Sequence, residues 1–318
     1  MLRKQKFGTN SGGCYPPPQP LGASGPELGG ASWANAISGA PDGTAWASWS
    51  EGGAITSGDS RLVRFDGARW EDHSGYVDLG ELIDLTSDGN YICDIESGPT
   101  GETWVGVCGA GGWGFGSGGL FVHRESGWED VPIFGDVGRS DVLVADVLAI
   151  ASGADGTTWA MVRPVLREQA EANAEAFAAG ECCPIDEPVT DPFLGSPMLV
   201  RYRDGAWSAY RWDLVSPAAD IPFDLLFESG DVMDVDDRGD LWVLAGDLED
   251  GAERILAFDG EIVRDFASVR NIRDLSIDDS GRAWLATRTG LLVVDPTGAE
   301  AAVRGLDDAV ATTTSDLL

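Results

Sequence analysis

The chain contains few of the residues that commonly carry out catalysis. It has only two histidines, His73 and His123, and no Gly-x-Ser-x-Gly segment in which a serine would act as a nucleophile. Two neighbouring cysteines, Cys182 and Cys183, have no histidine nearby, so a zinc site would lack its usual set of ligands. We therefore predict no catalytic residues, and the sequence leaves a metal site unassigned.

Two aromatic residues and five polar residues are the candidates for ligand binding. Trp113 and Phe115 stand among glycines in GAGGWGFGSGG, and no repeated pattern requires them at these positions. Either they contact a ligand, or they cover a neighbouring insertion or fill a central channel. The polar candidates belong to the first strands of a repeated unit, which can approach the mouth of such a channel: Asn35, Asp94, Asp231, Arg273 and Asp274.

A short acidic segment, DVDDRGD at 234–240, resembles a calcium-binding loop. The full Asp-x-Asp-x-Asp-Gly pattern does not occur, and a hairpin turn accounts for the same residues. Two Asp-x-Gly-x-x-Trp segments, which begin at Asp237 and Asp279, are similar to the sialidase Asp-box, which is a folding turn rather than an active site. We predict no cofactor here, and a divalent metal such as calcium stays an alternative.

Five segments of the chain share one pattern when they are aligned on a tryptophan. A glycine stands three residues before each tryptophan, and an apolar residue stands nine before it. An apolar run, a turn rich in Asp and Gly, and a second run that starts with Trp predict strand, tight turn and strand, with the ring buried against the sheet. The segments end at Trp46, Trp104, Trp159, Trp242 and Trp284.

A second hairpin follows each of these segments, as in RLVRFDGARW at 61–70. Each repeat therefore has four strands, and the chain is predicted to be all-β: a β-propeller of five four-stranded blades, with six blades as an alternative. We expect Ala309–Leu318 or the segment near Trp33 to close the ring. An insertion at 163–197 interrupts the third blade, and its Ala/Glu-rich first half is predicted to be helical.

The connections from second to third strand, and from one repeat to the next, lie on the same rim of a propeller. In this chain these connections are long, and loops on a rigid scaffold are the usual place for recognition. We therefore predict that this rim binds a partner. The segments concerned are 48–60, 108–119, 131–145, 163–197, 213–229 and 246–253.

The composition restricts the partners and the compartments. A formal net charge of −32 and a pI near 4.1 argue against nucleic acid, which is bound by clustered Lys and Arg. No apolar run approaches the ~18 residues of a membrane span, and no apolar region of a signal peptide follows MLRKQK. We expect a flexible Gly/Pro-rich tail at 1–30 and one propeller domain at 31–318, as a monomer.

Cys93 and Cys108 are expected on the first and second strands of the second blade, on opposite sides of one turn. A pair in this position forms either a cross-strand disulfide or two small buried side chains. The sequence leaves both alternatives open.

The repeat resembles that of the two-component-regulator propellers, which are related to the streptogramin lyase propellers. The segment IRDLSIDDSGRAWLATRTGLLVVD at 272–295 is the most similar, with Asp278 six residues before Trp284, and Asp236 repeats this position before Trp242. Ala40, Gly98 and Gly153 stand there in the first three repeats. The resemblance covers about residues 33–305 and concerns the fold more than the chemistry.

The resemblance implies a non-catalytic binding, interaction or sensing module with a weak preference for an extracytoplasmic location, because regulator propellers serve in that way. Its partner would be a protein or a carbohydrate. The alternative is an enzyme similar to the lyase or lactonase propellers, with an acidic metal site in the central channel. The lyases use histidine and a metal, and both histidines here belong to the outer parts of their repeats.

Overall fold

A computed structural model of the chain describes residues 32–51, 60–73, 91–108, 118–169, 171–172, 198–211, 233–246, 253–261, 263–269, 272–287, 290–295 and 302–304. These residues form five antiparallel sheets of four strands each, in which consecutive strands are hydrogen bonded in chain order. We number the sheets as blades one to five. The prediction of an all-β fold built from five four-stranded units is confirmed.

The strands have the following bounds. Blade one contains β1 (Ser32–Gly39), β2 (Ala45–Glu51), β3 (Ser60–Phe65) and β4 (Trp70–Asp72). Blade two contains β5 (Tyr91–Ser97), β6 (Thr103–Cys108), β7 (Gly119–Arg124) and β8 (Gly127–Asp130). Blade three contains β9 (Val142–Ser152), β10 (Thr158–Leu166), β11 (Met198–Arg203) and β12 (Ala206–Arg211). Blade four contains β13 (Met233–Val235), β14 (Leu241–Gly246), β15 (Glu253–Phe258) and β16 (Val263–Val269). Blade five contains β17 (Ile272–Ile277), β18 (Ala283–Thr287), β19 (Gly290–Asp295) and β20 (Ala302–Arg304).

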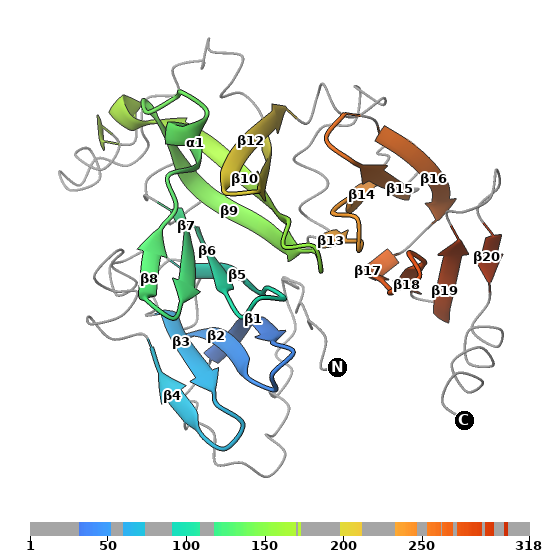
Figure 1. Cartoon of the computed structure of the whole chain (residues 1–318), viewed down its shortest axis with the longest axis horizontal. Helices are drawn as coiled ribbons and strands as arrows, with labels where there is room; N and C mark the ends of the chain where they lie inside the picture. The colour runs from blue at the N-terminus through green and yellow to red at the C-terminus, as the bar shows by residue number, and fades with distance from the viewer. Residues whose placement is uncertain are drawn as a thin grey trace.

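The blades follow one another around a common axis in chain order, with the first strand of each blade innermost (Figure 1). The innermost strands contact in succession: β1 with β5, β5 with β9, β9 with β13, and β13 with β17. Buried apolar clusters join blade one to two, two to three, three to four, and four to five. The arrangement is that of a β-propeller.

The same tight turn joins the first and second strands of every blade. Its glycine has a φ between +72° and +92°, which costs an L-residue with a Cβ conformational energy but costs glycine none. In each turn the glycine amide donates to the carbonyl three residues earlier, and the amide of that residue donates across the hairpin. The glycines are those of the predicted pattern, Gly43, Gly101, Gly156, Gly239 and Gly281.

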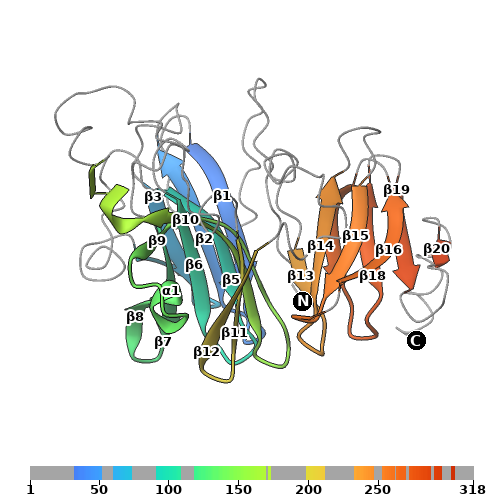
Figure 2. The same ribbon diagram turned by 90° about the horizontal axis from the view of Figure 1, so that it is seen from above.

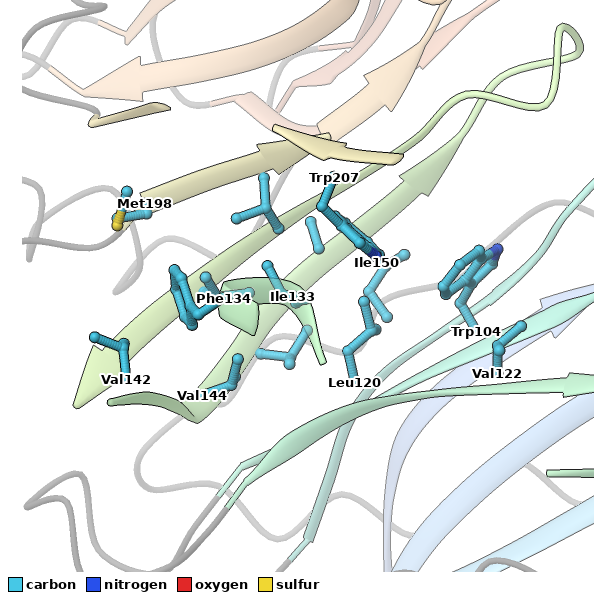
Figure 3. Packing of buried hydrophobic residues seen from close by; sticks show 14 residues of the cluster. Trp104, Leu120, Val122, Ile133, Phe134, Val142, Val144, Ile150, Met198 and Trp207 are labelled. Atoms are coloured by element: carbon cyan, nitrogen blue, oxygen red, sulfur yellow. The ribbon is translucent and has the colours of Figure 1, made fainter. Parts of the chain in front are cut away.

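The tryptophan after this turn fills the space between its own blade and the next. Trp104 is 1% exposed and belongs to the cluster that joins blade two to blade three, where Figure 3 shows it beside Ile150 of β9. The short helix α1 (Ile133–Asp136) adds Ile133 and Phe134 to this cluster. Trp46, Trp159 and Trp242 are 2%, 0% and 0% exposed and lie in the clusters that follow their blades.

The fifth tryptophan differs. Trp284 is only partly buried, although an equal burial is predicted for all five positions. Its ring N–H donates to Asp278 at 2.7 Å, and Trp242 makes the equivalent bond to Asp236 at 3.3 Å. The aspartate six residues before the tryptophan therefore holds the indole and the turn together in blades four and five.

Two predicted boundaries change. The insertion does not begin at 163, because β10 continues to Leu166 and pairs with the first residues of β9, as in Arg163 with Asp146. Residues 167–169 and 171–172 are helical, in agreement with the predicted helical start, and the remainder of the insertion lies outside the described residues. The connection predicted at 131–145 contains α1 and ends where β9 begins at Val142.

The expected closing segments have different outcomes. Trp33 is part of β1 and pairs with Ser50 of β2, so the segment near Trp33 is the start of blade one, and its role in closing the ring stays a prediction. Residues 309–318 lie outside the described residues.

The tryptophans of blades two and five differ in burial, so replacing them should lower the stability by different amounts. Trp104→Ala should lower the free energy of unfolding by about 3–5 kcal/mol, because it opens a cavity between two blades. Trp284→Ala should lower it by less, since part of this ring is already in contact with water. Denaturant unfolding of both variants measures the difference, and equal losses would contradict it.

The turn of blade five gives a pH-dependent contribution to stability. Partial burial raises the pKa of Asp278, but hydrogen bonds from the Trp284 ring, the Arg282 amide and guanidinium and the Ser280 hydroxyl outweigh it and lower the pKa from 3.8 to about 2. Because the folded pKa is depressed, the stabilisation is complete above pH 3.8 and is lost as the pH falls towards 2.

Asp278→Asn should therefore remove about 1 kcal/mol of stability at neutral pH and flatten the dependence on pH between 4 and 2. Asp279→Asn removes the same charge from the neighbouring exposed position and is the matched control. Urea unfolding across this pH range measures both. If Asp278→Asn keeps the pH dependence of stability of the unmodified chain, another group causes that dependence.

Candidate functional site

The propeller has two rims with different connections. The turns from first to second strand and from third to fourth strand lie on one rim, which we call the turn rim, and they run along the lower side in Figure 2. The connections from second to third strand and from blade to blade lie on the opposite rim, which we call the loop rim. The innermost strands therefore begin at the loop rim and end at the turn rim.

Side chains of the turn rim are largely occupied by the turns themselves. The carboxylate of Asp66 accepts from the amides of Arg69 and Ala68, and these bonds hold its pKa below the ordinary value. Asp42 accepts from the Thr44 amide and hydroxyl, which lower its pKa in the same way. These acidic groups stabilise hairpins, and they explain much of the Asp-rich punctuation of the sequence.

The innermost strands share a β-bulge near the loop rim. In blades one, two, three and five the strand pairing skips the residue eleven positions before the tryptophan, and in blade three it skips a second residue, at 145. A bulge bends the strand and turns one side chain out of the regular alternation, and bulges are frequent beside binding sites. The extra residues are Asn35, Cys93, Leu148 and Arg273, all of which are at least partly exposed.

Two of the predicted ligand-binding residues, Asn35 and Arg273, thus occupy the same bulge position in different blades. Asp231 has the same spacing to Trp242, but it lies outside the described residues, as do Trp113 and Phe115. Asp94 and Asp274 come directly after the bulge in blades two and five. The structure therefore places four predicted residues at one recurrent feature of the innermost strands.

Asp94 forms part of the contact between two blades. It is 1% exposed, and its carboxylate accepts from the Ile95 amide at 2.9 Å and from the Ile150 amide of blade three at 2.6 Å. Its oxygens thus satisfy backbone groups on two strands. Asp274 has the equivalent bond to the Leu275 amide at 2.9 Å, but its side chain is exposed.

Cys93 and Cys108 form a disulfide, with 5.8 Å between their Cα atoms. This decides between the two alternatives that the sequence leaves open. Since Cys93 is the bulged residue of β5 and Cys108 ends β6, the bond fixes the bulge to the loop-rim end of the neighbouring strand.

Sequence reasoning missed other residues of this region. Leu148 occupies the bulge of blade three, and the buried carboxylate of Asp146, 5% exposed, pairs with Arg163 at the extended end of that blade. Counting eleven residues back from each tryptophan finds Leu148 and Cys93. No spacing rule finds the Asp146–Arg163 pair, because it depends on the unexpected length of β9 and β10.

The two histidines lie away from the innermost strands. His73 follows β4 and His123 is on β7, and their rings contact Trp46 with centroid distances of 4.8 and 5.2 Å. Trp128 of β8 completes the cluster between blades one and two. Both imidazoles therefore belong to the outer packing of the propeller rather than to its central channel.

Two features are absent from the described residues. They contain no group of three or more His, Cys, Asp or Glu side chains arranged as metal ligands. The described part of the chain also has no helix that is long and apolar enough to cross a membrane.

No protein-family model and no curated protein matches the chain. Similar solved structures include a gluconolactonase from Xanthomonas campestris, at 16% identity and a TM-score of 0.45 over 87% of this chain and 76% of that one. Virginiamycin B lyase from Staphylococcus aureus has 10% identity and a TM-score of 0.42, over 85% and 82%.

The extracellular domain of a candidate hybrid two component system from B. thetaiotaomicron has 15% identity and a TM-score of 0.41, over 84% of this chain. The chain spans only 29% of that protein. These proteins include both groups that the repeat resembles, a two-component propeller and a streptogramin-type lyase. The likeness is one of fold, and it assigns no function.

The position of Asp94 gives a prediction that separates stability from binding. Asp94→Ala should lower the free energy of unfolding by about 2–3 kcal/mol, because the buried amides of Ile95 and Ile150 lose their acceptor. Asp94→Asn keeps one acceptor oxygen and should lose less. Denaturant unfolding measures both. Unchanged stability in Asp94→Ala would mean that the carboxylate does not join the blades.

Proposed function

We propose that the propeller is a binding module that recognises a protein or a carbohydrate through its loop rim. The observation that carries this proposal is the bulge shared by four innermost strands, which turns one partly exposed side chain per blade out of the sheet at that rim. Three of these side chains, Asn35, Leu148 and Arg273, differ in charge, polarity and size, whereas Cys93 is held in the disulfide. A constant backbone that presents variable side chains is typical of recognition surfaces.

Asn35 and Arg273 are the polar groups that this surface offers among the described bulges. An amide and an exposed guanidinium hydrogen bond well to sugar hydroxyls, carboxylates and backbone carbonyls. Trp113 and Phe115 stay proposed aromatic contacts of the same rim, and Asp231 a proposed polar one. The net charge of −32 disfavours nucleic acid as the partner.

The disulfide supports an extracytoplasmic location, because such bonds persist in oxidising compartments. We propose that residues 31–318 act there as one monomeric propeller domain, with 1–30 as a tail. A sensor module that works with a signalling partner is consistent with this role.

The enzymatic alternative places an acidic metal site in the channel. Asp94, a carboxylate of an innermost strand, already accepts from two backbone amides, and both histidines pack around Trp46. These contacts favour binding over lyase or lactonase chemistry. Measurement of the metal content after dialysis separates the two functions, since a stoichiometric divalent ion would favour the enzyme.

The binding proposal predicts different effects on the two rims. The labelled full chain is applied to a glycan array and, separately, to an extract of envelope proteins with cross-linking. Arg273→Ala with Asn35→Ala should lose at least tenfold in affinity for whatever glycan or protein the unmodified chain captures. Arg69→Ala, which removes an equally exposed arginine from the turn rim, should retain it.

A second variant tests the insertion of blade three. Replacing residues 173–196 with a short Gly/Ser turn leaves β10 and β11 intact, so the free energy of unfolding should change by only about 1 kcal/mol. Capture of the glycan or protein partner should be lost. Capture that survives both loop-rim variants, or that is lost in Arg69→Ala, would move the binding surface away from the loop rim.

A further inference from the structure

The face of blade five that points away from blade four differs from the other blade faces. Trp46, Trp104, Trp159 and Trp242 are at most 2% exposed because the next blade covers each of them, whereas Trp284 is partly exposed. Four buried clusters join consecutive blades, and within the described residues none joins blade five to blade one. Figure 1 shows an opening between these two blades.

Hydrogen bonds between neighbouring innermost strands follow a rule. At three of the four junctions the side chain eight residues before the tryptophan of one blade accepts from the backbone amide seven residues before the tryptophan of the next, and Ala151 stands at this position in blade three. Ser38 accepts from Ser97 at 2.9 Å, Glu96 from Ser152 at 3.0 Å, and Asp234 from Ile277 at 2.7 Å. Asp94 adds a second bond of this kind, from ten residues before one tryptophan to the Ile150 amide nine before the next.

Blade five carries both acceptors at the same positions. Asp274 stands ten residues before Trp284, as Asp94 does before Trp104, and the equivalent bond to the following amide orients the two carboxylates alike. Ser276 stands eight residues before Trp284. Its hydroxyl donates to Asp234, and a hydroxyl that donates can also accept.

The sequence that follows blade five repeats the start of blade five itself. Residues 269–277 read VRNIRDLSI, and residues 303–311 read VRGLDDAVA. The two segments share Val-Arg, in which Val269 ends β16 and Arg304 ends β20, then Ile or Leu two residues after the arginine, and Asp at the position of Asp274. Only two residues, 270–271, connect β16 to β17, so Gly305 is an adequate connection after β20.

We propose that residues 306–311, which lie outside the described residues, bind to this face of blade five as the innermost strand of a sixth blade. Asp274 then accepts from the amide of Ala309, and Ser276 accepts from the amide of Ala311. With the same bulge and the same register, Leu306, Ala309 and Ala311 face blade five, as Ile272, Leu275 and Ile277 face blade four.

Hydrogen exchange of the full chain, followed by mass spectrometry, tests this arrangement. Peptides that cover 306–311 should be protected from exchange, and Asp274→Ala should increase their exchange severalfold. Asp279→Ala removes an exposed carboxylate from the adjacent turn and should leave the protection unchanged. Ser276→Ala removes the second acceptor and should give a smaller increase.

Ala309→Pro completes a double-mutant cycle because it removes the amide that Asp274 would bind. Each single variant should lower the midpoint of thermal unfolding. The midpoint of the double variant should lie only slightly below that of the less stable single variant, because both changes remove the same hydrogen bond. Free exchange of 306–311 in the unmodified chain, or additive shifts in the cycle, would overturn the proposal. Protection that rises with protein concentration would also overturn it, because a second copy would then cover the face.

Discussion

The contact between one blade's tryptophan and the next blade is the interaction on which the whole structure depends. A single four-stranded sheet has too little apolar surface to bury on its own, and each blade gains a core only from its neighbour. The contact has a direction, since the ring of Trp104 reaches forward onto β9 and is covered by blade three. A ring built in this way needs a partner for the forward face of its last blade.

The hydrogen bonds of the innermost strands solve a second problem of the same geometry. An innermost strand is the edge of its sheet, and its outward amides have no partner within the blade. Asp94 and Glu96 provide acceptors for amides of β9, so that side chains of one blade satisfy backbone groups of the next. Acidic residues near the channel can therefore be structural, which is why composition alone does not identify them as ligands.

The sequence predicts the repeat well because its strongest signals are local. The turn glycine requires positive φ, and the tryptophan follows it at a fixed distance, so the first hairpin of every blade can be located from the chain alone. The bulges, the burial of Asp94 and the exposure of Trp284 depend on which blade lies next to which. The extended pairing of β9 with β10 also depends on tertiary contacts, and it moved the start of the insertion beyond Leu166.

Local and tertiary constraints act on different residues of the same innermost strand. In blade five the apolar residues nine and twelve positions before the tryptophan, Leu275 and Ile272, pack on the preceding blade. Acceptors for the following blade come from positions ten and eight, as Asp94 in blade two and Asp234 in blade four. The side chain of the bulged position between them leaves the regular alternation of the strand. The residues there differ from blade to blade: Leu148 packs against the cluster that joins blades three and four, whereas Asn35 and Arg273 are polar and at least partly exposed. The bulge is therefore a position where a propeller of this design can present a different side chain from each blade.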